Sequence, residues 1–243
     1  MVEAAVILVA GIGSRLRPIT DTRPKALAPI GEETILGRAV RLLLEFGVSR
    51  LILATGYRED AVRAALAQLQ SEVVYCPNPH YDSTQNSVSL ALCEQAVAGR
   101  AFFKLDGDVV FDPELLTRIA APAAELSVGV DSARHLDAEA MKVVVAGKSI
   151  RRFGKAVPLA ESHGESIGIE RISAAAAGKL FTALDERIAA GVTNLYYEDV
   201  YSEMIGRGEL AAEAVDVSGL RWAEVDTFED LEAARRLFTP SGA

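Results

Sequence analysis

The first third of the chain shows two patterns of apolar residues, short continuous runs and longer segments with apolar residues at helical spacing. Short continuous apolar runs at 4–9, 51–55 and 73–75 predict buried strands, because each is too short for a helix and is rich in branched side chains. Between them, 34–46 and 62–69 carry apolar side chains at helical spacing. This β-α-β-α-β order predicts an α/β fold with a doubly wound, mostly parallel, Rossmann-like sheet.

The same two patterns continue to the C-terminus. A helix that starts at Asn86 or Ser87 is expected to end near residue 96, and a buried strand is expected at 101–105. Residues 142–145 and 149–153 flank a short Gly-containing turn, which predicts a β-hairpin. The remaining predicted elements are strands at 167–170, 213–217 and 221–225, helices at 173–190 and 197–205, and a last helix that follows a Thr227–Asp230 capping box and ends near 238.

Composition and charge narrow the class of protein. Half of the 243 residues are apolar and 24% are charged, which suits an ordinary globular core. The formal net charge of −9 argues against a nucleic-acid partner, because nucleic-acid phosphates require a basic surface. We expect a cytoplasmic protein with no membrane partner, since no apolar run approaches about 18 residues and the N-terminus lacks a basic leader. Cys76 and Cys93 are expected to be buried free thiols.

The first predicted strand leads into a loop that is rich in glycine and cations. Gly11 and Gly13 allow a tight turn and the close approach of a ligand, and Arg15 and Lys25 follow in the same loop. Backbone N–H groups and cations in such a loop are typical of a polyphosphate site. The loop is neither a dinucleotide fingerprint, because Leu16 stands where a third glycine would be, nor a Walker loop, because Gly-Lys-Ser/Thr is absent.

The run A-G-x-G-x-R-L followed by P-K resembles the signature of the nucleotidyltransferases, which join a phosphorylated small molecule to a nucleoside monophosphate. The resemblance implies one GT-A-like domain over 1–243, with a nucleotide- and metal-binding core at 1–130 and 210–243 and a small β-rich acceptor-binding lobe at 131–209. It implies catalytic roles for Arg15 and Lys25, which would spread positive charge over the triphosphate and the acceptor. The implied nucleotide-binding residues are Val9, Ala10, Gly11, Gly13, Ser14, Arg15, Asn86, Ser87, Ser89 and Asp106.

Two aspartates that follow apolar strands are candidate metal ligands. Asp108 ends the segment K-L-D-G-D and Asp226 ends W-A-E-V-D, so only the fold could bring them together. Composition alone favours turn or capping roles for both. The resemblance favours metal binding, because Asp108 matches the family's metal-binding aspartate and V-D-T-F-E-D-L at 225–231 matches a late family motif. It implies that both hold Mg²⁺, whereas Asp106 could support that site or cap the turn.

Within the superfamily, the sequence is similar to the bacterial choline-phosphate, inositol-1-phosphate and aminoethylphosphonate cytidylyltransferases. The segments N-S-V-S-L at 86–90 and M-K-V at 141–143 carry this similarity. It implies that a phosphate or phosphonate oxygen of the acceptor attacks the α-phosphorus of CTP and that pyrophosphate leaves. The acceptor would contact Lys25 and, in the lobe, Lys142 and Lys155.

The segment Y-Y-E-D-V-Y at 196–201 places three aromatic and two acidic residues at a predicted helix start. Tyr197 and Tyr201 would share a helix face, and aromatic faces beside Glu198 and Asp199 would attract an organic cation, with Trp222 as a further candidate. We therefore expect these side chains to contact the acceptor, and phosphocholine or 2-aminoethylphosphonate to be preferred. The alternative is that the acids complement the helix dipole and the tyrosines are simply buried.

Three functions remain open at this point. The first is a Mg²⁺-dependent cytidylyltransferase. The second is a sugar-1-phosphate or inositol-1-phosphate nucleotidyltransferase that uses UTP, dTTP, GTP or CTP, because the same loop and aspartates would serve it. The third is an inactive nucleotide-binding regulatory subunit, which would be expected to lack Lys25 or an aspartate, although all are present. The sequence leaves the acceptor and the oligomeric state open, a homodimer included.

Overall fold

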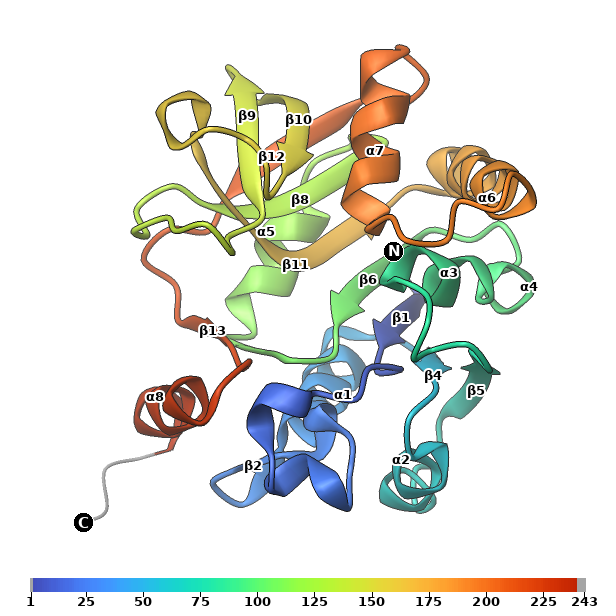
Figure 1. The fold of residues 1–243 in the computed structure, drawn as a ribbon, viewed down its shortest axis with the longest axis vertical. Coiled ribbons are helices and arrows are strands. Elements are labelled where there is room, and N and C mark those ends of the chain that lie inside the picture. The colour runs from blue at the N-terminus through green and yellow to red at the C-terminus, as the bar shows by residue number, and fades with distance from the viewer. Residues whose placement is uncertain (1, 240–243) are drawn as a thin grey trace.

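The computed structural model describes residues 2–239, and a nine-stranded mixed sheet runs through it (Figure 1). The strand order is β5-β4-β1-β6-β11-β8-β12-β10-β9. The first four strands are mutually parallel, and β11 then pairs antiparallel with both β6 and β8. The strands are β1 (Ala4–Leu8), β4 (Arg50–Thr55), β5 (Glu72–Pro77), β6 (Phe102–Asp106), β8 (Leu126–Asp131), β9 (Lys142–Ala146), β10 (Ser149–Gly154), β11 (Gly164–Ile172) and β12 (Ala212–Asp216). The predicted α/β class is confirmed, and the sheet is parallel in its first half and mixed in its second.

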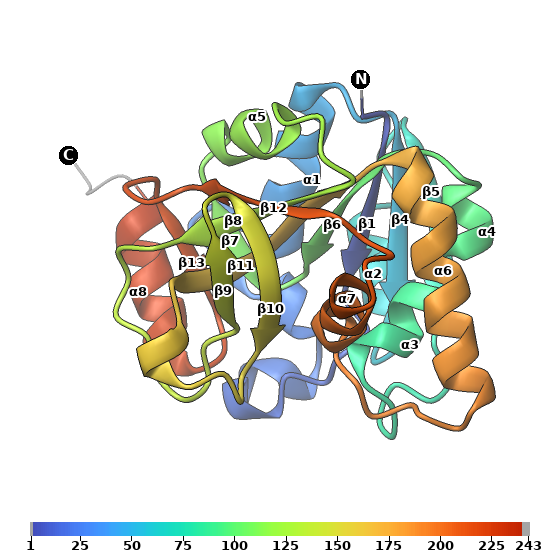
Figure 2. The same ribbon diagram turned by 90° about the horizontal axis from the view of Figure 1, so that it is seen from above.

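Helices cover both faces of this sheet (Figure 2). Along β1, Ala4 and Val6 contribute to one apolar cluster, and Ala5 and Ile7 contribute to another on the opposite face, as the two-residue period of a strand requires. The first cluster includes apolar side chains of α3 (Asn86–Ala91), α4 (Glu94–Val97), α6 (Ala174–Ala189) and α7 (Tyr197–Gly206), and the second includes those of α1 (Ile35–Phe46), α2 (Glu59–Ala65) and α5 (Glu114–Ala120).

A third, smaller apolar cluster joins the two ends of the chain. Leu16 of the N-terminal loop packs in the same cluster as Val110, Val225 and Leu231. The last three come from β7 (Val109–Phe111), the position directly after β13 (Trp222–Glu224) and α8 (Phe228–Phe238). Because β13 pairs antiparallel with β7, the segment that ends at Asp226 lies beside the turn that carries Asp108. Two short strands, β2 (Pro29–Ile30) and β3 (Glu33–Thr34), pair antiparallel directly before α1.

Local sequence signals explain most element boundaries. Thr34 caps α1, and the predicted Thr227–Asp230 capping box starts α8. The single helix expected from residue 86 to 96 is instead two short helices, α3 and α4, separated at Leu92 and Cys93. The hairpin expected at 142–153 is present as β9 and β10. Both cysteines are free and buried, as expected.

Four short 3-10 turns complete the described elements, at Ser14–Leu16, Ile19–Asp21, Lys25–Leu27 and Leu159–Glu161. Within residues 2–239, no helix combines the length and the apolar character that crossing a bilayer would need.

The cap of α1 lies away from the site described below and gives a test of the fold. The Gly37 N–H donates to Thr34 Oγ1 over 3.0 Å. Replacing Thr34 with Ala removes this acceptor, so we expect Thr34→Ala to lower the free energy of unfolding by about 1 kcal/mol. Thr34→Ser keeps the hydroxyl and should retain most of the stability. Urea unfolding would measure both, and equal midpoints for the two variants would contradict the capping role.

Candidate active site

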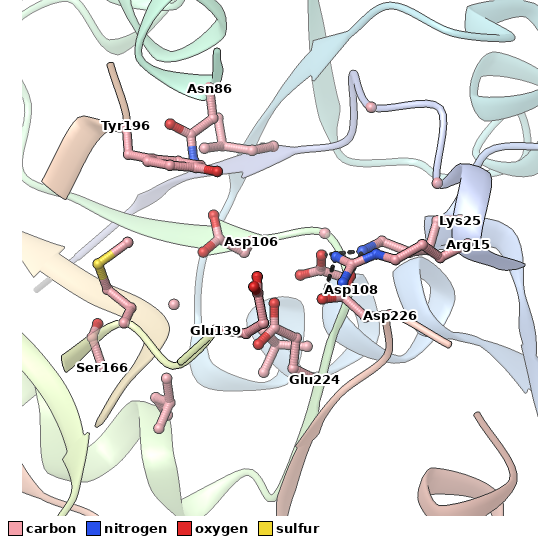
Figure 3. Close-up of a pocket in the computed structure, with 18 of the residues that line it drawn as sticks. Arg15, Lys25, Asn86, Asp106, Asp108, Glu139, Ser166, Tyr196, Glu224 and Asp226 are labelled. Atoms are coloured by element: carbon pink, nitrogen blue, oxygen red, sulfur yellow. Dashed lines mark hydrogen bonds and ion pairs between the residues drawn. The ribbon is translucent and has the colours of Figure 1, made fainter. Parts of the chain in front are cut away.

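A cavity of about 700 Å³ opens at the carboxyl ends of β1 and β6, where ligands bind in open α/β sheets. Its walls come from the N-terminal loop, α3, the turn after β6, the loop before β9, β11, the start of α7 and the segment after β13. Figure 3 shows the labelled side chains of these segments pointing toward a shared space. Segments far apart in sequence therefore form one site.

The glycine-rich loop is shaped by backbone requirements at one position. Gly13 has φ +66°, and a Cβ placed there would lie 2.7 Å from the Cβ of Lys25, so a larger residue would displace that lysine. Thr20 Oγ1 donates to the Gly13 carbonyl over 2.9 Å, and Tyr57 Oη donates to the Thr20 carbonyl over 2.8 Å. These bonds hold the loop in a fixed position against the segment after β4.

Lys25 bridges the two predicted metal-binding aspartates. Its Nζ lies 2.6 Å from Asp108 Oδ2 and 2.6 Å from Asp226 Oδ1. Arg15 Nη2 donates to Asp226 Oδ2 over 2.7 Å, so Asp226 contacts two cations (Figure 3). Burial opposes the charged form of Lys25, but the two carboxylates outweigh it and raise the pKa of Lys25 above its usual value. Burial likewise opposes ionisation of Asp226, but Lys25 and Arg15 lower the pKa of its carboxyl.

A third carboxylate, which the sequence analysis did not identify, completes the acidic cluster. One oxygen each from Asp108, Glu224 and Asp226 lie within 4.8 Å of one another. Burial and the negative charges of Asp108 and Asp226 together raise the pKa of Glu224 to about 8. Asp108 Oδ1 is buried and has no hydrogen-bond partner among residues 2–239. Glu224 stands two positions before Asp226, so strand periodicity could have placed both side chains on one face.

Most residues predicted to bind nucleotide line the cavity. They are Val9, Ala10, Gly11, Gly13, Ser14, Arg15, Asn86, Ser89 and Asp106. Asn86 Oδ1 accepts the Tyr197 N–H over 3.0 Å, which joins α3 to the first turn of α7. Ser87 does not line the cavity, because its Oγ points away and donates to the Leu195 carbonyl over 2.6 Å. The direct contact expected for Ser87 is therefore replaced by a bond that holds the chain before α7.

The two lobe lysines have different surroundings. Lys155 lines the cavity, where its Nζ lies 3.3 Å from Glu139 Oε2. Lys142 is buried beneath the cavity wall, and its Nζ donates to the carbonyls of Asp137, Ala138 and Ala140. These bonds fix the loop that carries Glu139. The acceptor contact expected for Lys142 is therefore not supported, and Lys142 instead shapes this loop.

The aromatic box expected at the start of α7 is already filled by the protein itself. Tyr197 and Tyr201 are fully buried and do not line the cavity. The Nζ of Lys104 lies 3.5 Å from the ring centroid of Tyr197, so an internal lysine occupies the place predicted for a bound cation. Asp199 Oδ2 accepts the Tyr196 N–H over 2.9 Å and caps the helix, which was the alternative interpretation. Of the four residues predicted there, Glu198 alone lines the cavity.

Further residues of the lobe, absent from the predicted set, face the cavity. Tyr196 lies beside Asn86, Glu139 lies near Glu224, and Ser166 also faces the cavity (Figure 3). Arg134 and Glu165 also line the cavity, with Arg134 Nε 3.8 Å from Glu165 Oε2. These residues sit on loops and strand ends whose direction the periodicity of the sequence does not reveal. The side of the cavity formed by residues 131–209 is therefore the part that the sequence predicted least well.

Comparison with known proteins places this site in a family. The profile described as "MobA-like NTP transferase domain" matches residues 5–138. The chain is 31% identical over 250 residues to "CMP-5'-(3-aminopropyl)phosphonate synthase" of Streptomyces rubellomurinus, which covers 97% of this chain and 39% of that longer protein. It is 24% identical over 230 residues to "2-aminoethylphosphonate cytidylyltransferase" of Lancefieldella rimae, which covers 94% of this chain and 90% of that one.

The solved structure of "the inositol-1-phosphate CTP transferase from T. maritima" has the same fold. It aligns with a TM-score of 0.82 at 22% identity, over 100% of this chain and 98% of that one. The family profile covers more than half of the chain, including the glycine-rich loop and Asp108. The chain belongs to the family of MobA-like NTP transferase domains.

Proposed function

We propose that this chain is a Mg²⁺-dependent cytidylyltransferase that transfers CMP from CTP to a small phosphate or phosphonate acceptor and releases pyrophosphate. The observation that carries the proposal is the convergence of Asp108, Glu224 and Asp226 beside Lys25 at the edge of the glycine-rich loop. The names of the Streptomyces and Lancefieldella relatives support CTP as the donor and a phosphonate or phosphate as the acceptor.

The acidic cluster fits a divalent cation of the hard type. Carboxylate oxygens are the protein ligands that Mg²⁺ prefers, and it commonly binds through one or two of them together with substrate phosphates. Asp108 Oδ1, which is buried without a partner in the described residues, gives the ion an unsatisfied ligand. Asp108 and Asp226 would hold the ion, with Glu224 next to them. Once bound, Mg²⁺ would supply positive charge to the phosphate oxygens of the nucleotide.

The protein's own cations would overcome the repulsion between two anionic substrates. Lys25 and Arg15 lie at the junction between the glycine-rich loop and the acidic cluster, where they would spread positive charge over both substrates. An acceptor phosphate oxygen forms the new bond to the α-phosphorus, and the bond to the bridging oxygen of pyrophosphate breaks. No covalent protein nucleophile is needed, because the acceptor is already ionised near pH 7. Positioning and charge stabilisation would carry the rate.

The two ends of the cavity would divide the substrates between them. Residues 1–130 and 210–243 would form the nucleotide- and metal-binding core, and 131–209 the acceptor-binding lobe. Asn86, Ser89 and the glycine-rich loop would contact the nucleotide. Lys155 and Glu198 would face the acceptor.

A nucleotide panel would test the proposed function. The protein would be incubated with Mg²⁺, a mixture of phospho- and phosphono-acceptors, and one of CTP, UTP, dTTP, GTP or ATP. Mass spectrometry should detect a CMP-linked product and pyrophosphate with CTP as the best donor. Faster transfer from UTP or dTTP to a hexose 1-phosphate would identify the sugar-nucleotide alternative. Binding of nucleotide without any product would identify a regulatory subunit instead.

The metal site gives the first prediction for catalysis. Asp108→Ala and Asp226→Ala should each abolish CMP transfer while leaving the circular-dichroism spectrum unchanged, because each removes a ligand from the same ion. Mg²⁺ should raise the melting temperature of the unmodified protein and should no longer do so in either variant. Asp185→Ala, which changes an exposed aspartate of α6, is the control and should behave like the unmodified protein. Normal turnover in either site variant would contradict the assignment.

Lys25 gives the second prediction. Lys25→Ala should lower kcat/KM by about 100-fold or more, because it removes a charge aimed at the reacting phosphates. Lys148→Ala is the matched control, since Lys148 is exposed on the β9–β10 turn and lies outside the cavity. Steady-state kinetics with CTP would measure both. A loss of only twofold in Lys25→Ala would show that Lys25 does not contact the reacting groups.

A further inference from the structure

A buried charge cluster lies beneath the cavity at the carboxyl end of β6. The Nζ of Lys104 lies 2.8 Å from Glu170 Oε2 and 3.2 Å from Asp106 Oδ1, and neither Lys104 nor Glu170 is exposed. Tyr197 Oη donates to Asp106 Oδ2 over 2.8 Å, so both oxygens of Asp106 are engaged from below. One ammonium group thus serves two carboxylates, and the cluster already carries more negative than positive charge when both are ionised.

Glu198 adds a third carboxylate to this surplus. It lines the cavity but is only 4% exposed, and its Oε2 is buried with no hydrogen-bond partner in the described part of the chain. Burial, which the nearby ammonium of Lys104 offsets only in part, raises the pKa of Glu198 to about 8. Buried carboxylate oxygens are normally paired, and an unpaired one is costly. Glu198 therefore requires a donor or a cation, and the cavity is the place from which one can come.

Three aromatic rings near the site, those of Tyr197, Tyr201 and Trp222, are not free to bind a cation through their faces. Tyr197 has the Lys104 ammonium over its ring, and Tyr201 packs between Tyr197 and Phe153 with no exposed surface. The guanidinium carbon of Arg134 lies 4.2 Å from the ring centroid of Trp222, which does not line the cavity. A quaternary ammonium is recognised by a cage of open aromatic faces. Tyr81 and Tyr196 do line the cavity, but the Nζ of Lys155 lies 5.4 Å from the ring centroid of Tyr196, so these rings do not offer a cage of several open faces.

Building on the cytidylyltransferase proposed above, we infer that the preferred acceptor carries a primary ammonium group, which donates a hydrogen bond to Glu198, and that a quaternary ammonium is disfavoured. A primary ammonium has three N–H donors, and one of them can satisfy Glu198 Oε2. A trimethylammonium has none, so its binding would leave the buried oxygen unsatisfied. Glu198 is thus a specificity-determining residue, and its role differs from that of the aromatic box expected from the sequence.

Two matched pairs of acceptors would test this inference with the unmodified protein and CTP. Phosphoethanolamine and phosphocholine differ only in the methyl groups on nitrogen, and 2-aminoethylphosphonate and 2-hydroxyethylphosphonate differ only in the amine. The primary amine of each pair should have a kcat/KM at least about tenfold higher. Trimethylammonium has no N–H donor and the hydroxyl group has no positive charge, so neither can make a charge-assisted hydrogen bond to Glu198. Equal or faster reaction of phosphocholine, or of the hydroxyl analogue, would overturn the inference.

The same acceptor panel gives a different result if the protein is not a cytidylyltransferase at all. Transfer of CMP to a neutral polyol phosphate but to neither amine would leave the cytidylyltransferase intact and overturn the role of the ammonium group. Absence of CMP transfer to every acceptor, polyol phosphates included, would overturn the proposed function and the inference with it. The same panel therefore separates the two outcomes.

A variant at the recognising carboxylate would test the residue itself. Glu198→Gln should raise the KM for 2-aminoethylphosphonate at least about tenfold, change kcat less, and abolish the preference over the hydroxyl analogue. Glu203→Gln is the matched control on the same helix, because Glu203 pairs with Arg187 outside the cavity, and it should keep the preference. An unchanged preference in Glu198→Gln would overturn the assignment. If circular dichroism shows that Glu198→Gln does not fold, Glu198→Asp is the second variant. It keeps the charge and should keep the preference for the amine. Loss of that preference in a folded Glu198→Asp would count against the inference.

Discussion

The paired contacts of Lys25 with Asp108 and Asp226 hold three distant segments of the chain in one place. The lysine comes from the N-terminal loop, one aspartate from the turn after β6, and the other from the segment that follows β13. Apolar side chains of the same segments, among them Leu16 and Val225, also pack together in the small third cluster. Attraction between opposite charges therefore fixes the front of the site, and burial of apolar surface fixes its support. Neither could hold the geometry alone, because the acids would repel one another without the lysine.

Charge balance also organises the interior beneath the cavity. Lys104 lies in the middle of β6, among the buried side chains Phe102, Phe103 and Leu105. A buried ammonium is retained only when carboxylates compensate it, and Glu170 and Asp106 do so here. Its presence also fills the space against Tyr197. The same lysine thus neutralises part of the interior and covers the face of the Tyr197 ring.

The parts of the site that follow from strand direction were predictable from the sequence. Apolar runs identify the strands, and the carboxyl ends of parallel strands meet at one edge, so Gly11, Asn86 and Asp108 could be placed together. Which side chains of α7 face the cavity could not be derived in this way. It depends on the partner that Tyr197 meets in the core, and that partner is a lysine within the otherwise apolar strand F-F-K-L-D. The unexpected charge in that strand was the available signal, and Glu224, two positions before Asp226, was another.

The hydrogen bond from the Tyr197 N–H to Asn86 Oδ1 makes one side chain part of both ends of the cavity. Asn86 faces the cavity beside the glycine-rich loop, and its amide oxygen also fixes the turn of α7 that carries Glu198. A substitution there would shift both ends at once. During divergence or directed evolution, nucleotide choice and acceptor choice would then not vary independently at this position. Such coupling would favour paired changes over single ones when a relative of this fold acquires a new substrate.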